Sequence, residues 1–249
     1  MAKKFMLSQI ESFYDKHAQD YFSQRTVEGG RLFNEYIDMP ATKEMLSGRI
    51  HKGSTLLDIG SGIGSYARHY AERGLDVTAI DISENMLEIA KKFCEPYKVK
   101  FKKQSFQEFK GRKASFDFVL GSFMLSYFDD LEAAFKKMSD LMKPNGMAVL
   151  SMLHPVKLSV KQRHDGMFCI SNYFDSGDYT TDLNFHEDQI SIKKWTLDDI
   201  AYCSKKANLY IDQIKEPKPD TTPNAYRTEG SFYLSCPSIM IFAFKKRSN

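Results

Sequence analysis

From residue 55 to residue 153 the sequence alternates between short apolar runs and segments of helical periodicity, and this alternation restricts the possible folds most. Repeated strand–helix pairs are typical of parallel βαβ units with helices on both faces of a sheet. The predicted strands are 55–59, 76–80, 99–101, 116–120, 147–153, 209–214 and 238–244, and the predicted helices are 63–73, 84–93, 131–142 and 196–207. We therefore expect an α/β fold with a seven-stranded sheet.

Two regions depart from this alternation. Residues 1–50 carry apolar side chains at three- and four-residue steps and are predicted to form a helical N-terminal cap, with one α/β domain over 51–249. Within that domain, residues 154–194 lose the regular pattern and are rich in Phe, Tyr, His and Asp. A segment of this length and composition suits a lid with aromatic walls over a substrate. A small second core beneath a long loop fits it equally well.

Composition excludes several classes of protein. The formal net charge of +3 argues against a dominant phosphate-binding surface. Four widely spaced cysteines form no C-x-x-C pair, so neither a zinc site nor a disulfide scaffold is expected, and no metal is predicted. The chain has no apolar run of about 18 residues and no targeting signal, so we expect a cytoplasmic protein with no membrane partner.

The first predicted strand leads into a loop with glycines at alternate positions, Gly60, Gly62 and Gly64. This spacing differs from the G-x-G-x-x-G fingerprint of nicotinamide dinucleotide sites. Asp58 precedes the loop, where a carboxylate suits a ligand with an ammonium or sulfonium charge better than a pyrophosphate. Asp81 ends the second predicted strand, where a carboxylate can accept hydrogen bonds from both ribose hydroxyls. The alternative interpretation of the loop is a tight turn that caps a helix.

Four ordered blocks, LLDIGSGIGSY, AIDISENML, FDFVLGSFMLSYF and LMKPNGMAVLSMLHP, resemble the class I S-adenosylmethionine-dependent methyltransferases of the small-molecule, type 11-like group. The resemblance is close over roughly residues 50–155 and holds only in outline elsewhere. It implies a Rossmann-like, doubly wound seven-stranded sheet, mostly parallel with an antiparallel last strand, a helical N-terminal extension and an insert after the fifth strand. It also implies S-adenosyl-L-methionine as cofactor, bound over the carboxyl ends of the strands, and S-adenosyl-L-homocysteine as product.

The resemblance further implies which residues hold this cofactor. The glycine loop would approach the methionine moiety and the ribose, and Asp81 would hold the ribose hydroxyls. Ile82 and Met86 would pack against the adenine, and Gly121 and Ser122, at the end of the fourth strand, would lie beneath the reactive methyl group. The predicted cofactor-binding residues are Tyr21, Asp58, Gly60, Ser61, Gly62, Asp81, Ile82, Met86, Ser105, Phe106 and Gly121.

The adenine contact departs from the family pattern. Members often have an Asp after the third strand that bonds the adenine amino group, whereas this sequence has Ser105 followed by Phe106. Ser105 could accept that bond, or the Phe106 backbone could carry it. Ser105 could equally be a plain helix N-cap.

The acceptor of the methyl group is harder to predict. His154 directly follows the fifth predicted strand, and Pro155 favours an extended backbone at the strand tip. An imidazole at this position suits removal of a proton from a hydroxyl or amine, so His154 is the predicted general base. A histidine bonded to a loop carbonyl is the alternative.

We expect methyl transfer from S-adenosyl-L-methionine to an oxygen or nitrogen of a small molecule, by a monomer or homodimer. An RNA or protein methyltransferase is one alternative, although the lysine clusters at 91–92, 102–103 and 110–113 are modest and argue against a nucleic-acid partner. A non-catalytic S-adenosylmethionine-binding regulatory module is the other.

Overall fold

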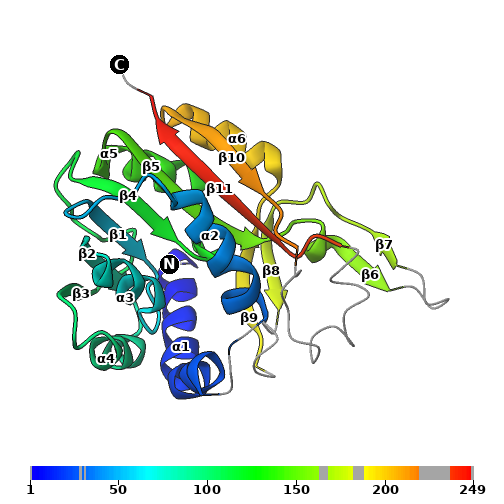
Figure 1. Ribbon diagram of the computed structural model, residues 1–249. Coiled ribbons are helices and arrows are strands. Elements are labelled where there is room, and N and C mark those ends of the chain that lie inside the picture. The colour runs from blue at the N-terminus through cyan, green and yellow to red at the C-terminus, as the bar shows by residue number, and fades with distance from the viewer. Residues whose placement is uncertain are drawn as a thin grey trace.

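The computed structural model describes residues 2–27, 30, 32–162, 168–181, 188–218 and 236–247. Its centre is a seven-stranded sheet with helices on either side (Figure 1). The strands of this sheet are β1 (Thr55–Ile59), β2 (Asp76–Asp81), β3 (Val99–Lys103), β4 (Phe116–Gly121), β5 (Met142–Leu153), β10 (Leu209–Lys215) and β11 (Ile239–Lys246).

The strand order across the sheet is β10-β11-β5-β4-β1-β2-β3. Strands β1 to β5 pair in parallel, whereas β11 runs antiparallel to both β5 and β10. This arrangement confirms the predicted Rossmann-like, doubly wound sheet with an antiparallel last strand. The direction in which the strands are added reverses between β1 and β4, and ligands of open α/β sheets bind in the crevice at such a reversal.

Helices cover both faces because successive strand residues point to opposite sides of the sheet. On β1, Leu56 packs in the core formed with α2 and α3, and Leu57 packs in the core formed with α5 and α6. The helices are α2 (Met39–Leu46), α3 (Ser65–Glu72), α4 (Glu84–Phe93), α5 (Leu131–Leu141) and α6 (Leu197–Lys206). Helix α6 begins with a capping box in which the Thr196 and Asp199 side chains each bond the other's backbone N–H.

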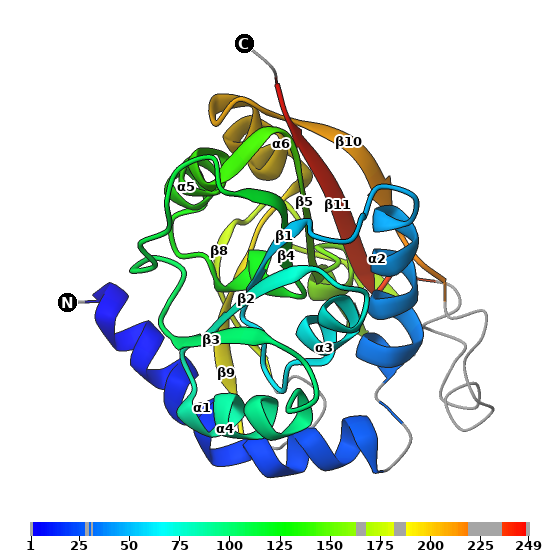
Figure 2. The same ribbon diagram turned by 60° about the vertical axis from the view of Figure 1, so that its left-hand side comes forward.

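The chain begins with α1 (Ala2–Thr26), which lies beside α4 in both views (Figures 1 and 2). A π-helical segment, η1 (Leu32–Asp38), continues directly into α2. These elements form the helical N-terminal extension expected from the sequence, while the division into a cap at 1–50 and a domain at 51–249 stays a prediction. No helix in the described ranges is long and apolar enough to cross a membrane.

The fifth strand starts earlier than predicted, at Met142 instead of Met147. Its pairing with β4 jumps from Met142 opposite Phe116 to Met147 opposite Phe118, so residues 143–146 leave the ladder. This bulge contains the Pro144-Asn145-Gly146 turn signal, and Asn145 has the positive φ that Asn tolerates. The turn signal in the sequence therefore corresponds to a bulge within one strand and not to a turn before the strand.

The insert after β5 contains regular structure that the sequence pattern did not predict. A single turn, η3 (Lys157–Ser159), precedes two antiparallel hairpins, β6 (Val160–Gln162) with β7 (Phe168–Ile170) and β8 (Gly177–Thr181) with β9 (Ile190–Lys194). Strands of three to five residues are too short for a clear period-two signal. The parts of the insert at 163–167 and 182–187 lie outside the described residues.

Candidate functional site

A cavity of about 230 Å³ opens at the carboxyl ends of the parallel strands. Its lining comes from β1, β2 and β5, from the loops that follow β1, β2, β3 and β4, from α1 and η1, from the turn η2 (Met124–Tyr127), and from the insert. Ten of the twelve predicted site residues line it: Tyr21, Asp58, Gly60, Ser61, Gly62, Asp81, Ile82, Met86, Ser105 and Phe106. Gly121 and His154 are not among the lining residues.

The glycine loop forms one wall of the cavity, and its backbone explains why glycines stand there. Gly60, Gly62 and Gly64 have φ values of +63°, +52° and +81°, a region that side chains disfavour. A Cβ on Gly60 would also lie 2.3 Å from the Met124 Sδ atom. The loop therefore lies close to η2. The Ser61 and Gly62 N–H groups point toward β2, where they donate to the Ile80 carbonyl and to Asp81.

Asp81 is held in place by this loop. The Gly62 N–H donates to Asp81 Oδ2 at 2.7 Å, and the Ser83 N–H donates to Oδ1 at 2.9 Å. A carboxylate has about four acceptor positions, so Asp81 keeps acceptor capacity for a ligand. Burial raises the pKa of Asp81, while these backbone hydrogen bonds favour its charged form. The side chain is thus a preoriented acceptor at the cavity edge of the sheet.

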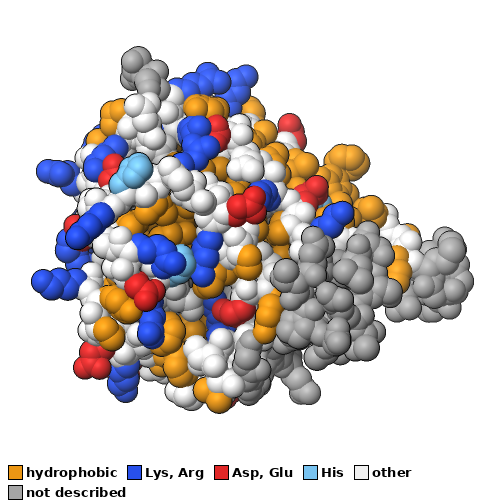
Figure 3. Space-filling view, viewed as in Figure 1, with side chains coloured by type: hydrophobic (Ala, Val, Ile, Leu, Met, Phe, Trp, Pro, Cys, Tyr) orange, Lys and Arg blue, Asp and Glu red, His pale blue; other side chains and the backbone are white. Residues whose placement is uncertain are grey.

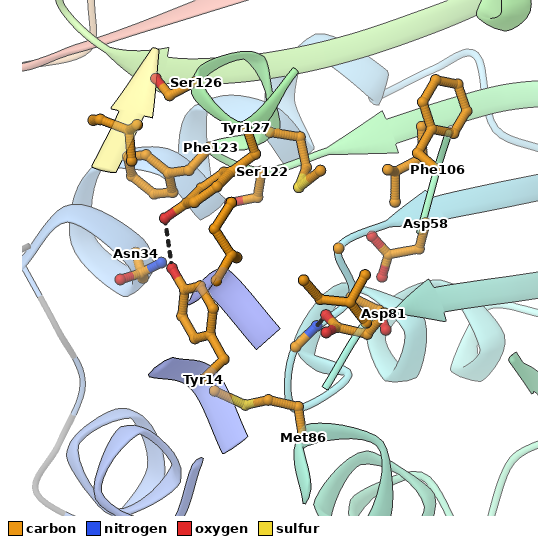
Figure 4. A pocket seen from close by; sticks show the side chains of 18 of the residues that line it. Tyr14, Asn34, Asp58, Asp81, Met86, Phe106, Ser122, Phe123, Ser126 and Tyr127 are labelled. Atoms are coloured by element: carbon orange, nitrogen blue, oxygen red, sulfur yellow. Dashed lines mark hydrogen bonds between the residues drawn. The ribbon is translucent and has the colours of Figure 1, made fainter. Parts of the chain in front are cut away.

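Asp58 lies across the glycine loop from Asp81, and Figure 4 shows both carboxyl groups on the same side of the cavity. Asp58 is only 2% exposed, and within the described residues its Oδ2 atom has no hydrogen-bond partner. Burial, and then the nearby charge of Asp81, raise the pKa of Asp58 to about 8. A buried carboxylate of this kind is stabilised by a cation.

Ser105 and Phe106 border the cavity after β3. The Ser105 hydroxyl donates to Glu108 Oε2 at 3.0 Å and accepts from the Glu108 N–H at 3.2 Å. The segment is a single turn and not a regular helix, but Ser105 caps it as an N-cap residue does, since its hydroxyl accepts from the N–H three residues on and its carbonyl from the Phe109 N–H. Phe106 is buried against Phe128, with ring centroids 5.5 Å apart.

Gly121 ends β4 beneath the cavity. A Cβ there would lie 2.8 Å from Leu150 Cδ2 and 3.0 Å from Met124 Cβ, so the glycine permits close packing between β4, β5 and η2. The next residue, Ser122, does line the cavity. Of the two residues that the resemblance places beneath the methyl group, Ser122 therefore lines the cavity and Gly121 does not.

The wall opposite the carboxylates is rich in tyrosines (Figure 4). The Tyr14 and Tyr127 hydroxyls lie 2.6 Å apart and join α1 to η2. The Tyr21 hydroxyl accepts hydrogen bonds from Arg25 at 3.1 Å and from Asn34 at 3.4 Å. This wall is made from side chains that are far apart in the sequence.

Sequence reasoning missed several members of this second wall. Asn34, Tyr127, Lys157 and Tyr179 line the cavity from four separate elements. Tyr127 carried a signal, since it lies in the block FDFVLGSFMLSYF, and Tyr179 lies in the insert whose aromatic side chains suit a substrate lid. The others become neighbours through the packing of α1, η1 and the insert against the sheet.

His154 follows β5 as predicted, but its ring is buried and turned toward other partners. Its Nδ1 accepts from the Val156 N–H at 3.1 Å, and Nε2 lies 2.8 Å from Glu216 Oε1. This pattern assigns the proton to Nε2, which donates to the carboxylate. Burial lowers the pKa of His154, and Glu216 partly opposes that effect.

Comparison with known proteins adds to this geometry. A family model described as a methyltransferase domain matches residues 57–150. The chain is 34% identical over 109 residues to phosphoethanolamine N-methyltransferase 2 of Caenorhabditis elegans, which covers 42% of this chain and 25% of that protein. It is 31% identical over 119 residues to ubiquinone biosynthesis O-methyltransferase of Xanthomonas axonopodis, covering 46% of this chain and 50% of that protein.

A crystal structure of an S-adenosylmethionine-dependent methyltransferase from Mesorhizobium loti shares the fold. Its TM-score is 0.72 at 20% identity, covering 87% of this chain and 100% of that chain. The first curated relatives match less completely, since the alignments span 61%, 25% and 42% of their lengths. The segment that the methyltransferase-domain model matches, residues 57–150, contains Asp58, the glycine loop and Asp81.

Proposed function

We propose that this chain, which matches a methyltransferase-domain model over residues 57–150 and shares the fold of S-adenosylmethionine-dependent methyltransferases, is a class I enzyme of that kind and transfers a methyl group from S-adenosyl-L-methionine to an oxygen or nitrogen of a small molecule. The observation that carries this proposal is the pair of buried carboxylates beside the glycine loop, one of which has an oxygen without a partner among the described residues.

The residues that line the cavity offer partners both to the cationic methionine part and to the ribose of this methyl donor. Asp58 would face the ammonium or sulfonium group, and the buried Ser61 hydroxyl, which has no partner among the described residues, would bond the methionine moiety. Asp81 would accept from the ribose hydroxyls with its remaining lone pairs. Ile82, Met86, Ser105 and Phe106 would enclose the adenine.

The donor supplies a methyl group that is already activated on a sulfonium, so the protein has mainly to position the acceptor and exclude water. The tyrosine-rich wall serves that purpose in this proposal, because it places aromatic faces and hydroxyl groups across the cavity from Asp58 and Asp81. The two relatives named for phosphoethanolamine and ubiquinone biosynthesis support a small-molecule acceptor.

The face of the molecule in Figure 3 gives little support to an RNA acceptor. Acidic side chains are interspersed among Lys and Arg over the described part of the face in Figure 3. A continuous basic track is the usual electrostatic feature of nucleic-acid binding.

The base role predicted for His154 requires a rearrangement, because the Nε2 proton is donated to Glu216 and the ring does not line the cavity. If the ring moves to the acceptor during the reaction, His154→Ala will lower the rate of methyl transfer much more than the affinity for the donor. A rate equal to that of the parent at saturating acceptor would exclude His154 as the base.

Incubation with methyl-labelled S-adenosyl-L-methionine and a metabolite extract tests the proposal. We expect the label in a small organic molecule, identified by mass spectrometry, and little label with the Asp81→Ala variant. Label in RNA or protein would contradict the acceptor class. Donor binding by calorimetry without labelled product would favour a regulatory module.

A further inference from the structure

Asp38 is a fully buried carboxylate next to the cavity that neither the sequence motifs nor the proposed donor site uses. It ends η1, and its Oδ2 atom accepts from the Tyr66 hydroxyl at 2.6 Å and from the Ser122 hydroxyl at 2.7 Å. Asp38 does not line the cavity, whereas Tyr66 and Ser122 both do. The carboxylate is therefore connected to the cavity by hydrogen bonds from two hydroxyl groups.

The direction of these hydrogen bonds follows from the charge of Asp38. An ionised carboxylate only accepts, so both hydroxyls donate their protons to Asp38. The lone pairs of the Ser122 oxygen are then available to accept a proton from a group in the cavity. The Asp38 Oδ1 atom is buried and has no hydrogen-bond partner among the described residues, which makes the protonated carboxyl group easier to accommodate.

The groups around Asp38 come from several elements. Burial raises its pKa, while the hydroxyls of Ser151, Tyr66 and Ser122 and the charge of Arg25 on α1 lower it. Burial and the proximity of Asp38 raise the pKa of Tyr66 well above its ordinary value, so the phenol keeps its proton. Asp38 is thus the group in this cluster that can change its protonation.

Ser122 lies between Asp38 and the cavity, at a position that suits proton transfer from one to the other. It follows Gly121 at the end of β4 and faces the cavity that also contains Asp58 and the glycine loop (Figure 4). Among the described lining residues the carboxylates are Asp58 and Asp81, which the proposed function assigns to the donor, and there is no histidine. A proton released by an acceptor needs another destination.

We propose that Asp38 is the terminal proton acceptor of the transfer and that the Ser122 hydroxyl relays the proton to it. The inference rests on the proposed function. The acceptor oxygen or nitrogen bonds to the methyl carbon as the sulfur–methyl bond breaks, and the electron pair of that bond stays on sulfur. The acceptor's proton passes to the Ser122 oxygen, and the Ser122 proton passes to Asp38 Oδ2. The acceptor is accordingly a hydroxyl compound or an amine with an N–H bond.

The test is a single-turnover measurement of label transfer against pH in the full chain, with the metabolite extract as acceptor source and saturating labelled donor. We expect Asp38→Asn to lower the rate about 100- to 10,000-fold, the usual contribution of a proton-transfer group, and to remove the decline in rate at low pH. Ser122→Ala should lower the rate less, because a water can replace the hydroxyl.

Tyr66→Phe separates proton transfer from a structural role. It removes a hydrogen bond to the charged form of Asp38, so the pKa of Asp38 rises and the low-pH decline moves to higher pH by about one unit. A purely structural role for the cluster would lower the rate equally at every pH. Asp117→Asn is the matched control, because Asp117 also accepts from a hydroxyl, that of Thr55, but lies at the opposite end of β4.

Calorimetric donor binding distinguishes this inference from the function on which it rests. We expect parent-like donor affinity in Asp38→Asn and Ser122→Ala. If both variants bind the donor and transfer label at the parent rate with the parent pH profile, the relay is excluded and the proposed function stands. If Asp38→Asn loses donor binding through misfolding, Ser122→Ala and Tyr66→Phe decide the matter. Absence of any labelled small molecule with the parent chain would contradict both.

Discussion

The two walls of the cavity are built in different ways. The wall with Asp58 and Asp81 comes from one continuous segment, residues 58–107, and the Asp81 carboxylate is oriented by backbone N–H groups of that same segment, 2 and 19 positions away. The wall with Tyr14, Asn34 and Tyr127 comes from segments up to 113 positions apart, and side chains hold one another there. The first wall is therefore set by local backbone geometry, whereas the second depends on how α1 and the insert pack.

Asp81→Ala should have the largest effect on donor binding, since it removes the acceptor that the glycine loop orients. Loss of hydrogen bonds to a charged group from two hydroxyls corresponds to about 3 kcal/mol, or roughly a 100-fold weaker affinity. Isothermal calorimetry measures this. Asp76→Ala is the control, because Asp76 starts the same strand, is exposed and pairs with Lys100. Equal affinities of the two variants would refute the placement of the ribose.

Asp58→Asn should have a smaller, pH-dependent effect on donor binding. Because the pKa of Asp58 is about 8 in the folded chain, most of the carboxyl is protonated below that pH and must lose its proton to face a cation. Donor affinity should thus rise with pH up to about 8 in the parent, and the variant should bind about tenfold more weakly at pH 8 with less pH dependence. Identical pH profiles would remove Asp58 from the cation site.

Asp58 should also make the stability of the parent depend on pH, with the opposite sign to donor affinity. The folded state holds the Asp58 proton more tightly than the unfolded state, so the free energy of unfolding falls as pH rises from the ordinary carboxyl range to about 8. Asp38 and Asp81 act in the same direction, since burial raises the pKa of each. Denaturant titrations should show a shallower decline for Asp58→Asn than for the parent.

The smallest effect should come from the second wall. Tyr14→Phe and Tyr127→Phe each remove one partner of a hydrogen bond worth about 1 kcal/mol, and the double variant should lose little more than either single variant. Denaturant unfolding measures all three. Tyr97→Phe serves as control, because its exposed hydroxyl bonds Glu72 away from the cavity. Additive losses would show that the two hydroxyls do not depend on each other.

The difference between the walls also explains which predictions succeeded. The strand–helix alternation predicted the sheet, because burial on both faces of a parallel strand requires consecutive apolar residues, such as Phe118–Leu120 in β4. The backbone after Asp58 has positive φ at three alternate positions, and glycine stands at each of them, so the loop is recognisable from the sequence. These features depend on short-range sterics and burial, so they are encoded over a few residues.

His154, Asp38 and the insert show where local reasoning is insufficient. The strand end was predicted for His154, yet the direction of its ring depends on Glu216, 62 positions away. Nothing near Asp38 in the sequence indicates that it meets Tyr66 and Ser122, 28 and 84 positions along the chain. The hairpins of the insert likewise depend on pairing between short runs.

The sequence by itself determined the α/β class, the glycine loop and the two carboxylates beside it, because hydrophobic periodicity and backbone conformation are properties of neighbouring residues. The tertiary structure alone decided which side chains line the cavity opposite Asp58 and Asp81, which histidine nitrogen donates to Glu216, and which buried carboxylate is hydrogen-bonded to a serine of the cavity. Those outcomes depend on contacts between distant segments, where buried polar groups must find partners wherever packing places them.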